Sequence, residues 1–156
     1  MKPESFSGTT PPLTFESYFV GTTHAAGMVF DRSGTLKRQF TAEMFGQWDE
    51  PTQTLTLNES FRFSDGEQQN RTWTVKKRDQ HTYEGTADDV VGKAIGRQFG
   101  SAIRFEYVLR VPIGTKTYAI NFEDWLFLQA DGTILNKAVM RKFGFRVGEL
   151  IVAFRK

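Results

Sequence analysis

The sequence predicts an all-β domain, an antiparallel up-and-down β-barrel of about 8–10 strands with a short N-terminal helix. Short apolar alternations of period two recur along the chain between turn signals, and the connections are too short for parallel crossovers. The 156 residues also include 15 phenylalanines, and aromatic side chains favour pleated, half-buried surfaces. Closing the sheet into a barrel removes the exposed edges that an open meander would keep.

Two parts are expected along the chain, a flexible leader over residues 1–12 and a single barrel domain over residues 13–156. The segment Ser5–Pro12 is rich in Ser, Gly, Thr and Pro, a composition typical of a tether. A short helix is predicted over Phe15–Phe19, leading into the first strand.

Turn signals divide the barrel domain into hairpins, because each supplies residues that tolerate a positive φ or cap a tight reversal. The clearest are Asp31–Gly34, Ser64–Glu67, Ile113–Lys116 and Ala130–Gly132. Between the turns, alternate residues fall on one face of each predicted strand. The runs with this pattern are Phe40–Trp48, which only Phe45 interrupts, Leu55–Phe63, Trp73–Lys76, Ile103–Val111, Tyr118–Phe122 and Glu149–Phe154. Residues 134–143 fit both a strand and a helical stripe.

The composition argues against several classes of function. With no cysteine, the chain has no disulfide, no thiolate nucleophile and no cysteine-ligated metal. His24 and His81 lie far apart and have no metal-ligand spacing, so neither a metal nor a cofactor is expected. Lys and Arg outnumber Asp and Glu only 20 to 18, so no nucleic-acid partner is expected. No nucleophile-elbow motif occurs, and no catalytic residue is assigned.

Small residues gather in the segment Gly92–Gly100, where Gly92, Ala94 and Gly96 share one face if the segment is a strand. One interpretation is a wall without bulky side chains that opens a ligand cavity. The other is that these glycines mark bulges or barrel corners. The sequence supports both interpretations equally.

Charged residues also fall at positions that the alternation places inside the barrel, namely Glu59, Arg71 and Asp124. Glu59 and Arg71 can pair across a hairpin, and Asp88 and Asp89 are further candidates for contacts. These residues form either a structural salt-bridge network, which is the favoured interpretation, or a polar anchor that orients the head group of an apolar ligand.

The stretch Asn136–Arg146 mixes four basic residues with Phe143 and Phe145. Such a pattern can dock on anionic lipid surfaces. A solvated strand or turn is favoured, because the local charge is modest.

Five segments together resemble an uncharacterised bacterial family. They are Asp31–Gly34, Ser64–Glu67, Ala87–Gly92, Asp124-Trp125 and Lys142–Gly144. The resemblance runs from about Leu13 to the C-terminus and implies a lipocalin-like, calycin-type barrel and a role around fatty acids or phospholipids. Many members look like lipoproteins with an acylated cysteine, which this chain lacks. The resemblance therefore implies a periplasmic or membrane-anchored protein if a lipidated N-terminus has been removed, and a cytoplasmic one otherwise.

The leading hypothesis is a lipid carrier or envelope-lipid accessory protein, a monomer or weak dimer close to a membrane surface, whose barrel holds a fatty acid or phospholipid-derived ligand. One alternative is an enzyme that acts on a lipid with a cavity carboxylate, although the sequence leans away from catalysis. The other alternative is a scaffold protein with a filled barrel. The residues predicted to bind the ligand are Trp48, Glu59, Arg71, Trp73, Gly92, Gly96, Phe105, Tyr107, Phe122 and Asp124.

Overall fold

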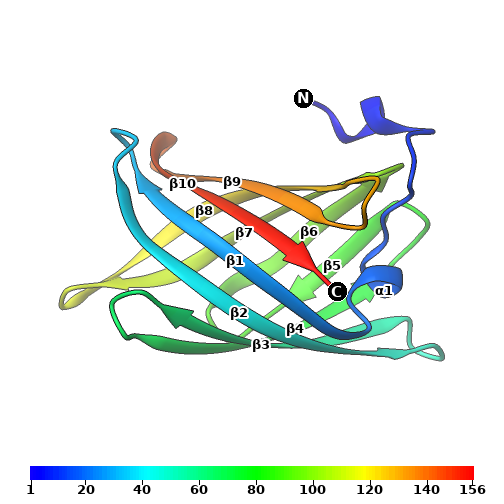
Figure 1. The fold of residues 1–156 in the computed structure, drawn as a ribbon, viewed down its shortest axis with the longest axis horizontal. Coiled ribbons are helices and arrows are strands. Elements are labelled where there is room, and N and C mark those ends of the chain that lie inside the picture. Colours follow the sequence, from blue (N-terminus) through cyan, green and yellow to red (C-terminus); the bar gives the residue numbers. More distant parts are fainter.

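Ten antiparallel strands close into a barrel in the computed structural model, which describes residues 1–156 (Figure 1). Each strand pairs with its neighbours in sequence, and β1 pairs with β10 to complete the closure. The predicted up-and-down barrel is therefore confirmed. The elements are a 3-10 helix η1 (Pro3–Phe6), α1 (Phe15–Tyr18), β1 (Gly21–Asp31), β2 (Leu36–Asp49), β3 (Thr54–Phe63), β4 (Gln68–Lys77), β5 (Thr82–Thr86), β6 (Val90–Phe99), β7 (Ala102–Ile113), β8 (Lys116–Leu128), β9 (Ile134–Lys142) and β10 (Phe145–Arg155).

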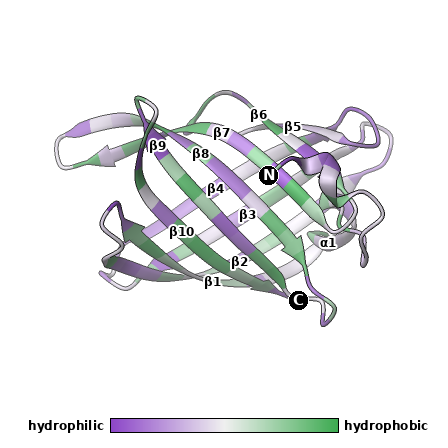
Figure 2. Ribbon diagram, turned by 90° about the horizontal axis from the view of Figure 1, so that it is seen from above, coloured by the Kyte–Doolittle hydropathy of each residue, from purple (hydrophilic) through white to green (hydrophobic).

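The strands bury alternate side chains, as their period-two pattern predicts. Figure 2 shows the alternation as bands of opposite hydropathy along each strand. In β2, Phe40, Ala42 and Met44 are buried, whereas the intervening side chains are exposed. Phe45, which interrupts the pattern in sequence, is 48% exposed and points outward. The register of β2 is thus set by its inward face.

The four predicted turns lie at hairpins, and residues 134–143, whose pattern fits both a strand and a helix, contain a strand. Ile134–Lys142 forms β9, which pairs with β8 on one side and with β10 on the other. The segment is a strand and not a helix because, as a strand, its backbone forms hydrogen bonds with neighbouring strands on both of its edges within the closed sheet. The last strand begins four residues before the predicted Glu149, at Phe145.

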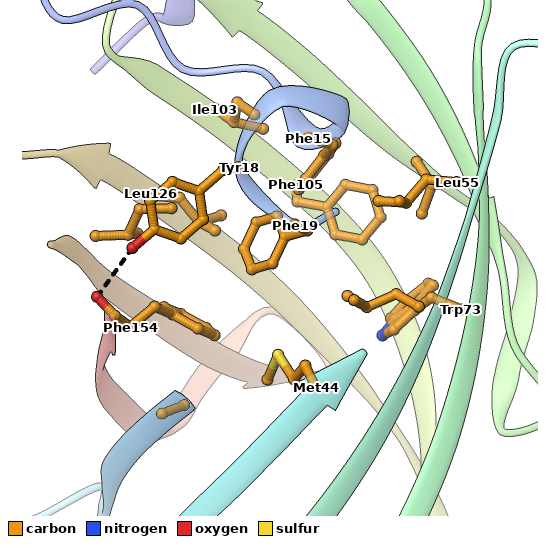
Figure 3. Packing of buried hydrophobic residues seen from close by; sticks show 14 of the residues in the cluster. Phe15, Tyr18, Phe19, Met44, Leu55, Trp73, Ile103, Phe105, Leu126 and Phe154 are labelled. Carbon is orange, nitrogen blue, oxygen red and sulfur yellow. Dashed lines mark hydrogen bonds between the residues drawn. The ribbon is translucent and has the colours of Figure 1, made fainter. Parts of the chain in front are cut away.

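Helix α1 closes one end of the barrel, opposite the hairpins β1–β2, β3–β4, β7–β8 and β9–β10 (Figure 1). Thr14 caps it, since the Thr14 hydroxyl accepts the Ser17 backbone N–H at 3.1 Å. Phe15 and Phe19 enter the core, where Phe15 packs edge-on against Phe105 at 5.3 Å (Figure 3). Helix α1 is therefore a plug at one end of the barrel.

Polar contacts hold this plug in place. Glu16 forms an ion pair with Lys77 and accepts the Tyr83 hydroxyl at 2.6 Å. The Tyr18 hydroxyl donates to the carbonyl oxygens of Gly132 at 2.7 Å and Phe154 at 3.2 Å, the second bond being visible in Figure 3. The contacts join α1 to β4, β5, β10 and the β8–β9 turn, so movement of the plug would break bonds on several sides at once.

The leader lies against the outside of the barrel. The Phe6 ring packs against Trp125 and Phe127, with centroids 5.8 and 5.3 Å away. The Thr9 hydroxyl accepts the Ser101 backbone N–H at 2.9 Å. Phe6 of the leader thus has aromatic partners on the outer face of β8. Neither helix has the length and apolar character needed to span a membrane.

Candidate functional site

A cavity of about 830 Å³ lies inside the barrel, so the interior is not filled by the protein's own side chains. Phe15 and Phe19 of α1 line one end, and Lys37, Ile113 and Lys142 on the hairpins line the other. Of the 38 lining residues, 26 are hydrophobic. A volume of this size falls within the range of about 300–1,000 Å³ typical of small-molecule sites. The arrangement provides a deep, mainly apolar chamber with one end plugged.

Aromatic rings from three strands form one wall of the chamber. The Trp73 ring lies 5.2 Å from the rings of both Phe105 and Tyr107, and Tyr107 stacks on Phe122 at 5.2 Å. Trp73 is on β4 and Phe105 on β7, with β5 and β6 between them in the sheet, yet their rings meet over Gly85 of β5 because that position has no side chain. A Cβ at Gly85 would lie only 2.9 Å from the Phe105 ring. The glycine therefore makes room for the ring.

A group of polar side chains interrupts the apolar lining on β3, β4, β7, β8 and β9. We call this group, together with Asp89 behind Arg71, the polar cluster; Asp89 does not line the chamber, and the residues that do are Glu59, Arg71, Tyr107, Asp124 and Asn136. Burial makes such groups costly unless they are paired. Their partners therefore decide what the cluster can do.

In one half of the cluster, Arg71 lies between two carboxylates. Glu59 and Arg71 are directly opposite each other in the β3–β4 register, as the sequence suggested, with Nη1 3.7 Å from Oε1. Asp89, in the turn before β6, takes the Arg71 Nε and Nη2 donors at 2.9–3.1 Å in a forked arrangement. Glu59 Oε1 is buried and accepts no hydrogen bond. Arg71 thus gives its hydrogen bonds to Asp89, and Oε1 of Glu59 has no hydrogen-bond donor.

The other half centres on Asp124. The Tyr107 hydroxyl donates to Oδ2 at 2.6 Å, and the Asn136 amide donates to Oδ1 at 3.2 Å. The same amide nitrogen also donates to the Trp125 carbonyl oxygen at 3.0 Å, which fixes its orientation. Asp124 therefore has one neutral donor on each oxygen and no cation bonded to it.

These surroundings shift the pKa values of both inward carboxyls. Burial, reinforced by the charges of Asp124 and Asp89, raises the pKa of Glu59 to about 7 against the attraction of Arg71. Burial also raises the pKa of Asp124 to about 6, opposed by its hydrogen bonds from Tyr107 and Asn136. Both carboxyls therefore change charge near neutral pH, inside a chamber whose walls are mainly apolar.

Seven of the ten residues predicted to bind a ligand line the chamber: Glu59, Arg71, Trp73, Phe105, Tyr107, Phe122 and Asp124. Trp48, Gly92 and Gly96 do not. Trp48 donates its indole N–H to Glu50 near the plugged end of β2. Gly92, with φ +67°, is exposed at a bulge where the β6–β7 register jumps, and Gly96 is packed beneath Phe105 and Tyr83. The small residues of β6 thus serve a bulge and an aromatic ring, and they do not widen the cavity.

The prediction missed Asn136 and the hairpin residues at the open end. Asn136 is a buried polar residue at an inward position of β9, the same signal that identified Glu59. The ambiguity of residues 134–143 hid it. Of the other acidic candidates, Asp88 is exposed and lies outside the chamber. No group of three His, Cys, Asp or Glu residues is placed to hold a metal ion.

Comparisons with solved structures support the barrel fold and extend no further, because the identities are low. A protein of unknown function from the DUF3598 family of Nostoc punctiforme superposes with a TM-score of 0.64 at 14% identity, over 92% of this chain and 49% of that one. This chain thus spans about half the length of the Nostoc protein. An S-type phycobiliprotein lyase from Guillardia theta superposes with a TM-score of 0.61 at 6% identity, over 91% of this chain and 90% of the lyase.

The barrel is lipocalin-like, as these neighbours are. No protein of curated function matches the chain. A family model does match it, over residues 1–156, and its description is "Protein of unknown function (DUF3833)". The chain therefore belongs to the DUF3833 family.

Proposed function

We propose that this protein binds a hydrophobic ligand of the lipid class, a fatty acid or a phospholipid-derived molecule, inside its barrel. The observation that carries the proposal is the plugged chamber of about 830 Å³ with 26 hydrophobic residues among its 38 lining residues. An empty apolar space of this size lowers stability, because its walls lack packing partners, and an acyl chain would supply them. The resemblance of the barrel to a phycobiliprotein lyase supports the proposal only at the level of the fold.

The role in the cell that we propose is that of a carrier or accessory protein for envelope lipids. The aromatic wall of Trp73, Phe105 and Phe122 would contact the chain of the ligand, and Glu59, Arg71 and Asp124 would contact its polar end. The periplasmic or membrane-anchored location implied by the family resemblance belongs to this same proposal.

Native mass spectrometry of protein purified gently from its own host tests the proposal, followed by organic extraction of whatever remains bound. We expect a stoichiometric acyl-chain ligand. A mass that stays bare after incubation with fatty acids and phospholipids would overturn the carrier function.

A matched pair of variants locates the bound molecule. Val111 lines the chamber, whereas Val108, on the same strand, does not. Val111→Trp should therefore lose the bound ligand, and Val108→Trp should keep it. Retention of the ligand by Val111→Trp would place it outside the barrel.

A second candidate function is an enzyme that acts on a lipid substrate, and the titration of Glu59 and Asp124 near neutral pH favours it. Asp124→Asn keeps the hydrogen-bonding shape and removes the acid. Loss of turnover of a bound lipid by this variant, with ligand binding retained, would support catalysis. Equal slow turnover by the variant and the parent protein would count against it.

A further inference from the structure

The polar cluster has an excess of hydrogen-bond acceptors over donors. It contains three carboxylates, from Glu59, Asp89 and Asp124, and one guanidinium, from Arg71. The Arg71 guanidinium already gives its Nε and Nη2 donors to Asp89. Only Nη1 remains toward the chamber, and it already faces Glu59 at 3.7 Å. A ligand carboxylate at this depth would meet like charge and no free cation.

Glu59 Oε1 is the acceptor in this cluster that lacks a hydrogen-bond donor. The Glu59 side chain is 9% exposed, lines the chamber and leaves Oε1 without a hydrogen bond. A buried acceptor without a donor costs folding free energy, which a bound donor would return as affinity. The remaining cations of the lining, Lys37, Arg38, Arg110 and Lys142, lie toward the hairpin end, away from the plug.

We propose that the ligand places a hydrogen-bond donor, an amine or a hydroxyl, against Glu59 and the polar cluster, and that a free carboxylate is excluded there, which narrows the proposed ligand from fatty acids to phospholipid-derived molecules that carry such a donor. This inference rests on the proposed function, because it names the head group of the ligand bound in the same chamber. The donor gives Glu59 Oε1 its missing hydrogen bond, and an amine also neutralises part of the excess negative charge of the cluster. Specificity of this kind is strong where buried polar groups would otherwise stay unpaired.

Isothermal titration calorimetry at pH 8 with dodecylamine, 1-dodecanol and dodecanoate tests the head group while keeping the chain constant. We expect the amine and the alcohol to bind roughly tenfold or more tightly than dodecanoate, the size expected for one buried acceptor gaining a donor. Glu59→Gln should remove most of this preference. Glu43→Gln, on the exposed face of the neighbouring strand β2, is the matched control and should keep it.

The outcomes separate the two proposals. Equal binding of all three probes, or tightest binding of dodecanoate, would overturn the head-group assignment and leave the carrier function standing. Binding of none of them would contradict the carrier function itself. An unchanged preference in Glu59→Gln would show that the donor contacts some other residue, and would also overturn the assignment.

A second inference comes from the hairpins at the open end of the barrel. Phe143 is 89% exposed and Phe145 is 76% exposed, although both are large apolar side chains. Ile113, at the tip of the adjacent β7–β8 hairpin, is 57% exposed. Phe143 and Gly144 both have positive φ, 52° and 79°, the conformation of a type I′ turn that favours Asn-Gly. Phenylalanine has no conformational preference for this turn, and the Phe143 ring stays exposed with the Lys142 ammonium 5.3 Å from its centroid.

The charged residues within the two tip segments are all basic. The segments 113–118 and 141–147 contain Lys116, Arg141, Lys142 and Arg146 and no acidic residue. Glu123 pairs with Arg141 at 3.2 Å and Glu149 pairs with Arg146, so Lys116 and Lys142 are the two of these cations without an acidic partner. Exposed aromatic rings among cations match the combination of apolar chains and negative head groups at an anionic bilayer surface.

We also propose that the β7–β8 and β9–β10 tips dock the open end of the barrel on an anionic lipid surface. Co-sedimentation with vesicles of equal parts phosphatidylglycerol and phosphatidylcholine should show binding that pure phosphatidylcholine vesicles lack. The double variant Phe143→Ser/Phe145→Ser should weaken it by about tenfold or more, since two rings lose their insertion. Phe45→Ser, which removes an exposed ring from the barrel wall, is the control and should bind normally. Absence of binding to the anionic vesicles, or equal binding by the double variant, would overturn the proposal.

Discussion

Glu59→Gln exchanges one buried carboxylate oxygen for an amide group of nearly the same volume, so it isolates the effect of the charge. Glu59 is 8% exposed, and burial is the main reason that its pKa rises from 4.5 to about 7. Each pKa unit corresponds to about 1.4 kcal/mol, so ionising Glu59 costs about 3 kcal/mol more in the folded protein than in the unfolded chain. The parent protein bears this cost only where Glu59 is ionised.

The sign of the effect follows from linkage. The folded protein binds the Glu59 proton more tightly than the unfolded chain, so the stability from this carboxyl is fully present below pH 4.5 and is lost as the pH rises to about 7. Glutamine does not ionise. The variant should therefore match the parent in free energy of unfolding below pH 4.5 and exceed it by about 2–3 kcal/mol at pH 8.

Guanidinium chloride unfolding at pH 4.5, 6 and 8, followed by tryptophan fluorescence and circular dichroism, measures this difference. The exposed Glu43→Gln should follow the parent at all three pH values. A Glu59→Gln protein that is less stable than the parent at pH 8 would refute the reasoning. A difference that does not change with pH would refute it as well, because the effect would then arise from packing.

Two further predictions concern the plug and the ion pair. A Cβ at Gly46 would overlap the carbonyl oxygen of Phe19, so Gly46→Ala should push the end of α1 outward and lower the free energy of unfolding by about 1–3 kcal/mol. Denaturant unfolding that places this variant within about 0.5 kcal/mol of the parent would show that the plug is not rigidly held. Arg71→Met should cost about 3 kcal/mol at pH 8, where Glu59 and Asp89 lose their shared cation, and less at pH 5, where Glu59 takes up a proton. An equal loss at both pH values in thermal or denaturant unfolding would contradict the electrostatic explanation.

Where one face of a strand is buried, the sequence was sufficient to predict both strand and register. The alternation from Phe40 to Trp48 and the turn at Ser64–Glu67 together fix the β2–β3–β4 hairpins, and this register is what sets Glu59 opposite Arg71. The outward Phe45 was no obstacle, because its neighbours on both sides are buried. The period-two alternation and the residues of the turn are therefore sufficient to predict this part of the fold.

The contents of the barrel could not be predicted in the same way. Glycine in a strand leaves a space, and only the tertiary structure decides what fills it. At Gly85 and Gly96 the Phe105 ring fills the space, and at Gly92 a bulge turns the position outward. The position of the plug could likewise not be predicted from the local sequence pattern. A helix at Phe15 was expected, but its position against the barrel depends on Gly46 and on other residues distant in the chain.

Closure of the barrel by β1 and β10 has a consequence for how the protein folds during synthesis. His24 pairs with Arg155 and Asp31 with Gly148, so the first strand made waits for the last before one of its edges is covered. The hairpins from β2 to β9 can form as they emerge from the ribosome, but the edge of β1 stays open until β10 has followed. Contacts between such distant segments make folding slow and expose an edge that can pair with other chains. Protection of that edge, by speed or by a chaperone, is therefore a requirement of this topology during translation.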